Sequence, residues 1–177
     1  AASAKAMVTS LAECLRYSLV TKNGGSVPLS IELDAVRQYL SLEQELGGGR
    51  LNVVFDLDET IQSKMLPAYS ILTPVEYMLR SLALADDDGG AVTMEVRSRC
   101  RENELEISLS RLGSGLRSTI EPSFDERLRE MQARFAESST GGGRMELVHE
   151  HGEQRIAVNV IFSDQDTYGT KITNDHH

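Results

Sequence analysis

The chain has 177 residues, of which 40% are hydrophobic, and its formal net charge is −9 at pH 7. This length and the regular apolar pattern predict one packed domain, with or without a helical extension. The acidic balance argues against a nucleic-acid partner and against direct binding to an anionic membrane, because both need clustered Lys and Arg, and no apolar run approaches the roughly 20 residues that span a bilayer.

Two helices are expected at the start of the chain. Residues 4–19 carry apolar side chains at helical spacing, which predicts an amphipathic helix without a partner in the neighbouring sequence. A second helix is expected over residues 31–46, with Ser30 as its N-cap and Glu32 in its first turn, where an acidic side chain suits the helix dipole. The apolar residues of the first helix are Met7, Leu11, Cys14, Leu15 and Leu19.

The remaining pattern alternates between strands and helices. Residues 50–58 indicate a strand and residues 72–84 a helix. Alternating segments at residues 92–96 and 105–109 predict a hairpin, and a further helix and a last hairpin follow over residues 124–135 and 145–162. Hairpins make most of such a sheet antiparallel, and three helices remain to cover it. The expected fold is therefore an α/β two-layer sandwich, with a mixed, mostly antiparallel sheet covered by helices on one face and preceded by a separate helix.

Three local strings in the first 44 residues resemble one known family. They are L-R-Y-S-L at residues 15–19, V-P-L at residues 27–29 and E-L-x-x-V-R-x-Y-L-x-L-E-Q at residues 32–44. With the order of elements, they resemble the GHKL (Bergerat-type) ATPase domain of sensor histidine kinases, in particular the LytS and AlgZ group. The resemblance divides the chain into the end of a dimerisation helix (residues 1–22), a GHKL ATPase-like domain (residues 23–163) and a tail (residues 164–177). The terminal His176 and His177 are a possible tag remnant.

The resemblance implies a role in two-component signalling. Members of this family are bacterial proteins whose kinase domain lies in the cytoplasm, joined to a membrane sensor. They bind ATP and Mg²⁺, phosphorylate a His on the dimerisation helix and pass the phosphate to a response regulator. For this chain it implies a homodimer through the first helix, a response regulator as partner, and membrane attachment only through an upstream sensor region. The acceptor His is expected upstream of residue 1.

The family's N-box helix, L-x-P-L-V-E-N, supplies an Asn that holds Mg²⁺ and a Glu that positions the attacking group. Leu72 and Pro74 match this pattern. Aligned without a gap, the Asn position falls on Met78; with one deletion, Glu76 is kept and the Asn position falls on Tyr77. In either alignment the Mg²⁺ ligand is lost, because hard cations take oxygen donors from carboxylates, amides or phosphates.

The family's G1 box, D-x-G-x-G, follows a strand, and its Asp accepts a hydrogen bond from the adenine amino group. The same register here gives Arg111, Gly113 and Gly115, so the glycines remain and the Asp has become Arg. A guanidinium carries only donors and cannot accept that hydrogen bond. We expect Arg111 to block the adenine site and to pair with Glu76. A plain tight turn at the two glycines stays open as the alternative.

The family's second glycine box, G-x-G-L-x-N, opens the helix that follows the ATP lid and cradles phosphates with backbone N–H groups. The register set by Leu128 places Asp125 and Arg127 at its glycines and Glu130 at its Asn. The two carboxylates would repel a triphosphate. This box is therefore also expected to be vestigial.

No metal site is expected in the chain. Cys14 and Cys100 are typical of reduced cytosolic thiols rather than of a disulfide framework. His149 and His151 flank a glutamate near a hairpin turn, without a further ligand cluster nearby in the sequence. A polar turn is the favoured interpretation of that segment.

The motif losses favour a pseudokinase: a packed GHKL-like domain that needs no cofactor, binds neither ATP nor Mg²⁺, and acts by protein contact. The alternative is an atypical active histidine kinase that binds ATP–Mg²⁺ through other residues and phosphorylates a His outside this chain. A third interpretation, an unrelated α/β scaffold, is disfavoured by the specific string over residues 16–44.

Overall fold

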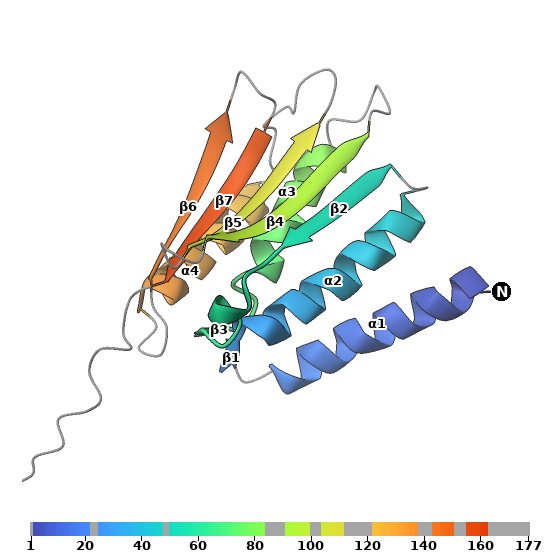
Figure 1. Cartoon of the computed structure of the whole chain (residues 1–177), viewed down its shortest axis with the longest axis horizontal. Helices are drawn as coiled ribbons and strands as arrows, with labels where there is room; N and C mark the ends of the chain where they lie inside the picture. The colour runs from blue at the N-terminus through green and yellow to red at the C-terminus, as the bar shows by residue number, and fades with distance from the viewer. Residues whose placement is uncertain are drawn as a thin grey trace, which may run out of the picture.

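The computed structural model describes residues 2–21, 25–47, 50–83, 91–99, 104–111, 122–137, 143–150 and 155–162. A five-stranded sheet with strand order β2-β4-β5-β7-β6 forms one layer (Figure 1). Strand β2 runs parallel to β4, and the other neighbours are antiparallel. The bounds of the strands are β2 Leu51–Asp56, β4 Val92–Arg99, β5 Glu104–Arg111, β6 Gly143–Glu150 and β7 Arg155–Phe162.

Three helices cover one face of this sheet, and a fourth lies beside them (Figure 1). Helix α2 (Leu29–Leu46) lies along β2, while α3 (Leu72–Ala83) and α4 (Pro122–Glu137) lie behind β5 and β6. Helix α1 (Ala2–Val20) packs against α2. The predicted two-layer sandwich with a preceding helix is confirmed. No helix in the described ranges is long and apolar enough to cross a membrane.

The core lies between the sheet and the three covering helices. The cross-strand register places Leu105 opposite Val160, and both side chains are fully buried. From the helices, Leu33, Met78 and Phe135 are fully buried against this layer. Each such side chain contributes about 1.5–3 kcal/mol through removal of apolar surface from water. The apolar residues repeat every 2 residues in the strands and about every 3.6 residues in the helices, and these two periods predicted the core correctly.

A small second sheet was not expected from the sequence. Strands β1 (Ser26–Pro28) and β3 (Met65–Pro67) pair antiparallel, and a short 3₁₀ helix, η1 (Glu59–Ile61), precedes β3. The backbone that leads into β3 explains why the predicted N-cap, Ser30, is wrong. Helix α2 begins at Leu29, and its first amides donate to backbone oxygens, Leu29 to Lys64 at 2.8 Å and Ser30 to Gln62 at 2.9 Å. A side-chain cap is not needed where neighbouring backbone satisfies these donors.

Helix α1 has two different sides. Tyr17, and Thr21 just after its end, are buried against the rest of the chain. Four apolar side chains of the same helix are exposed by half or more of their surface: Val8, Leu11, Leu15 and Leu19. Three of these belong to the predicted apolar stripe, while the side chains of Met7 and Cys14 lie outside the described part. The described part of the stripe, Leu11, Leu15 and Leu19, therefore does not pack on the sandwich.

Candidate functional site

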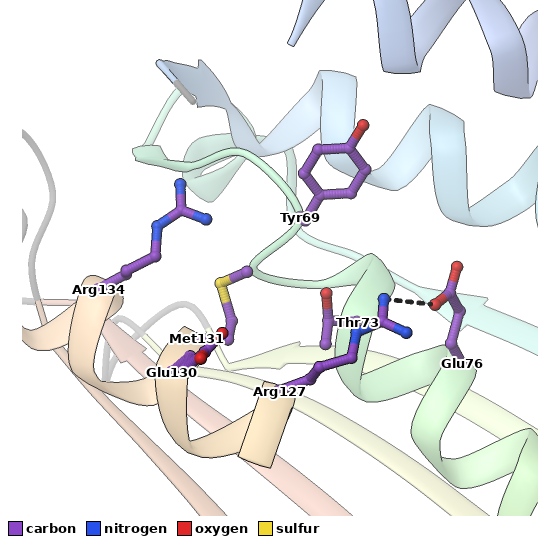
Figure 2. Close-up of a pocket in the computed structure, with 7 residues that line it drawn as sticks. All are labelled: Tyr69, Thr73, Glu76, Arg127, Glu130, Met131 and Arg134. Atoms are coloured by element: carbon purple, nitrogen blue, oxygen red, sulfur yellow. Dashed lines mark ion pairs between the residues drawn. The ribbon is translucent and has the colours of Figure 1, made fainter. Parts of the chain in front are cut away.

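A pocket of about 270 Å³ lies between α3 and α4, beside the turn that precedes α3. Figure 2 shows that α4 contributes one wall and that α3 contributes the other. The lining mixes two carboxylates and two guanidinium groups with smaller polar and apolar side chains: Tyr69, Thr73, Glu76, Arg127, Glu130, Met131 and Arg134. This is the region where the sequence predicted the vestigial N-box and second glycine box.

Glu76 projects from α3 toward the pocket, and its side chain is 25% exposed. One carboxylate oxygen lies 3.6 Å from Nη2 of Arg127, whose side chain is 54% exposed (Figure 2). Burial raises the pKa of Glu76; the charges of Arg127 and Arg80 oppose this, while Glu43 adds to it. The result is a partly desolvated carboxyl that holds its proton more tightly than an exposed glutamate does.

Tyr77 and Met78, the two alternative positions of the family's Asn, do not line the pocket. Successive residues of a helix are rotated by about 100°, so the two side chains that follow Glu76 turn into the core. Tyr77 is 1% exposed and Met78 is fully buried. Neither side chain fits Mg²⁺, because one is a thioether and the other is a phenol enclosed by the hydrophobic core.

Arg127 was predicted only as a residue that had replaced a glycine. In the structure it belongs to α4 and reaches across to α3, where it forms the ion pair with Glu76. Glu130 and Arg134 lie on the same side of α4, one and two turns further along. The pocket thus carries guanidinium donors suited to an anionic group and carboxylates that repel one.

Several predicted site residues fall outside the described part of the chain. Gly113 and Gly115 are among them, as are the side chains of Arg111 and Asp125, although Arg111 itself ends β5, paired with Val92. The described ion pair of Glu76 is with Arg127. The expected pairing of Arg111 with Glu76, and its blocking of the adenine site, stay predictions.

The same holds for the candidate metal ligands. Cys100 and His151, and the side chains of Cys14 and His149, lie outside the described residues. Within the described ranges, no three His, Cys, Asp or Glu side chains are grouped so that they could hold a metal ion. The expectation of no metal site stays a prediction.

Sequence reasoning missed the most enclosed acidic side chain near this site. Glu32, expected only as a first-turn acid that suits the helix dipole, is fully buried. Its carboxylate accepts hydrogen bonds from the Tyr17 hydroxyl and from the backbone N–H groups of Tyr69, Ile71 and Leu72. It therefore caps the N-terminus of α3 from another helix. The signal was its spacing: it lies three residues after Leu29 and thus on the apolar face of α2.

Several known proteins are similar to this chain in sequence. A family model described as histidine kinase matches residues 1–51. Sensor protein LytS of Enterococcus faecalis is 27% identical over 113 residues, which are 64% of this chain and 19% of that protein. Sensor histidine kinase YpdA of Escherichia coli is 27% identical over 126 residues, which are 71% of this chain and 21% of that protein.

A solved structure shares the fold. The histidine kinase domain of the EL346 blue-light activated histidine kinase from Erythrobacter litoralis superposes with a TM-score of 0.56, over 92% of this chain and 79% of that one, at 17% identity. The chain thus has the fold of a histidine kinase catalytic domain. The matches in sequence confirm its resemblance to LytS-type sensor histidine kinases with a GHKL-like domain. The chain spans about a fifth of the length of the curated relatives that it matches.

Proposed function

We propose that this domain is a degenerate catalytic-type domain of a two-component sensor histidine kinase, which does not bind ATP and acts through protein contacts. The observation that carries the proposal is the burial of Tyr77 and Met78, at 1% and 0% exposure. A Mg²⁺ ion bound to a triphosphate needs an oxygen ligand at the pocket surface. Whichever alignment is taken, the position of the family's Asn is occupied by a core side chain.

The pocket itself supports the same proposal. Its volume of about 270 Å³ is just below the range of roughly 300–1,000 Å³ that small-molecule sites occupy. The Arg127–Glu76 pair extends across it from α4 to α3. A nucleotide entering between these helices would have to separate the pair and approach the carboxylates of Glu76 and Glu130.

Calorimetric titration of ATP with Mg²⁺ into the full 177-residue chain tests the proposal. We expect a dissociation constant weaker than about 1 mM, which corresponds to roughly −4 kcal/mol. Each lost charge-assisted contact costs on the order of 1.5–3 kcal/mol, and several are lost together. The single variant Arg111→Asp is expected to remain silent, since the Mg²⁺ ligand is still missing. A dissociation constant below 1 mM for the unmodified chain would contradict the proposal.

The contacts through which the domain acts are proposed to include a second copy of this chain and a response regulator. The exposed stripe on α1 supports the first, because a lone helix cannot bury such a stripe. Leu15→Lys should dissociate the dimer in sedimentation experiments. Thr9→Lys adds the same charge at an exposed position off the stripe and should leave the dimer intact. A monomer before any substitution would contradict the homodimer.

The proposed setting is the cytoplasmic face of a bacterial membrane, with the domain joined to an upstream sensor region. The resemblance to LytS-type sensor proteins supports this setting. Expression of this chain together with the sequence that precedes it, followed by membrane fractionation, checks it. The domain should then sediment with the membrane fraction and be cut by a protease added from the cytoplasmic side.

The alternative is an atypical active kinase that binds ATP–Mg²⁺ through other residues. One observation favours it: in the alignment with one deletion, Glu76 keeps the position of the N-box acid, at a pocket that also holds Arg127 and Arg134. Its raised pKa suits a general base better than an exposed carboxylate does. Under this alternative, ATP binds in the titration above, and Glu76→Gln abolishes phosphate transfer while leaving ATP affinity nearly unchanged.

A further inference from the structure

Glu32 connects three helices at one buried point. It belongs to α2, and one carboxylate oxygen accepts a hydrogen bond from the Tyr17 hydroxyl of α1. The second oxygen accepts hydrogen bonds from the backbone N–H groups of Ile71 and Leu72, at 3.1 and 3.3 Å, at the start of α3. The three helices therefore share one fully buried acceptor. A directional network of this kind fixes relative orientation more strictly than apolar packing does.

Tyr69 links this point to the pocket. Its amide donates to the Glu32 carboxylate and lies 3.2 Å from the Tyr17 hydroxyl, and its ring meets the Tyr17 ring edge-on with centroids 5.2 Å apart. Its own hydroxyl is hydrogen-bonded to that of Thr21, just beyond α1, at 3.0 Å. The same residue lines the pocket, where Figure 2 shows its ring on the side toward α2 and α1.

The backbone of Tyr69 is held in an unfavourable conformation. Its φ is 70°, in the left-handed region that glycine occupies without cost and other residues rarely adopt. Such a conformation is strained and persists only where surrounding contacts enforce it. Here the enforcing contacts come from Tyr17 and Glu32. Loss of the α1 contacts removes part of what keeps this turn strained.

We propose that Tyr17, Glu32 and Tyr69 form a joint that couples the position of α1 to the pocket between α3 and α4. If α1 rotates or shifts, the Tyr17 hydroxyl leaves Glu32, and a buried carboxylate loses a donor. The turn at Tyr69 and the first turn of α3 then rearrange, and with them the wall of the pocket that carries Thr73 and Glu76. Because each of these hydrogen bonds is either formed or broken, the joint can act as a two-state element.

The two sides of α1 allow a partner to contact the helix on one side while the joint holds it on the other. The buried side carries Tyr17, and the opposite side carries the exposed stripe of Leu11 and Leu15. A partner bound to the stripe would set the position of α1 and hence the state of the joint. This last step rests on the proposed function, in which a second copy binds there, whereas the joint itself rests on the described contacts.

Amide hydrogen exchange on the full chain tests the joint with Tyr17→Phe, which removes the hydroxyl and keeps the ring. We expect exchange at Tyr69, Ile71 and Leu72 to become about tenfold faster, the loss of roughly one buried hydrogen bond, and the amide shifts of Thr73 and Glu76 to move. Thr9→Val is the matched control. It also removes a hydroxyl from α1, but one that donates at 3.0 Å to the backbone oxygen of Lys5 in the same helix.

Two outcomes would overturn the joint. Unchanged exchange at the start of α3 in Tyr17→Phe would mean that the network transmits nothing. An equal rise at the sheet amides of Val96 and Val158 would mean that Tyr17 only stabilises the whole fold. Leu15→Lys separates the proposals: if it leaves the oligomeric state unchanged while Tyr17→Phe acts as expected, the dimer on α1 is wrong and the joint stands.

Discussion

Glu32 contacts the start of α3 from α2, whereas Glu76 belongs to α3 itself, and the two carboxyl groups differ in how far they are removed from water. Glu32 lies at the first turn, fully buried, with four hydrogen-bond donors around it. Glu76 lies one turn further along, at the pocket, with an ion pair of 3.6 Å to a half-exposed arginine. Burial raises the pKa of each carboxyl. The first carboxylate is an internal part of the fold, whereas the second can lose or exchange its partner at small cost.

Replacing each glutamate by its amide measures this difference directly. Glu32→Gln should lower the free energy of unfolding by roughly 2–4 kcal/mol at pH 7, because the amide group turns an N–H donor toward the buried amides of Ile71 and Leu72. Glu76→Gln should change it by no more than about 0.5 kcal/mol, as is usual for a solvent-accessible ion pair. Urea titrations compared at equal slopes measure both. Equal losses in the two variants would remove the distinction.

The sequence predicted the elements and the core because these depend on local periodicity. It did not predict the network around Glu32, because its partners are separated by 15 to 40 residues, from Tyr17 to Leu72. The apolar spacing of α2 is compatible with an inward-facing Glu32, a signal that the sequence analysis missed, and no local pattern identifies its hydrogen-bond donors. The proposed loss of the N-box Asn rests on residue types and the family resemblance alone. The burial of Tyr77 and Met78 and the ion pair between Arg127 and Glu76 depend on tertiary packing around α3 and α4, which local patterns do not reveal.

The stability of the fold at alkaline pH tests whether the Tyr17 hydroxyl is enclosed beside the Glu32 carboxylate. Burial, and then the Glu32 charge, raise the pKa of Tyr17 above its ordinary value of 10.0. A group whose pKa is raised by folding stabilises the fold fully below its unfolded pKa and loses that contribution as pH rises through the folded one. Wild-type stability should therefore fall by about 1.4 kcal/mol more than that of Tyr17→Phe between pH 9 and 11.

Urea titrations at pH 9, 10 and 11 measure this slope in both proteins, and other groups that titrate in this range cancel in the difference. Tyr39→Phe is the matched control, because burial and Glu43 also raise the pKa of Tyr39, on α2. It should flatten the slope without accelerating exchange at the start of α3. Parallel pH profiles for wild type and Tyr17→Phe would show that the Tyr17 hydroxyl is not enclosed beside a charged Glu32.

The smallest change in stability is expected for Arg127→Gln, which removes the ion pair with Glu76. Stability at pH 7 should change by less than about 0.5 kcal/mol, because the arginine is half exposed and its separation from the carboxylate is long. The pKa of Glu76 should nevertheless rise further, since Arg127 is the largest influence that lowers it against the effect of burial. Arg129→Gln removes an exposed cation of the same helix that does not line the pocket and should leave that pKa in place. Carbon-13 NMR titration of the Glu76 carboxyl separates the variants. A loss of more than 1 kcal/mol in Arg127→Gln, with no shift in the Glu76 titration, would make the pair a structural element like Glu32 and end the contrast between the two glutamates.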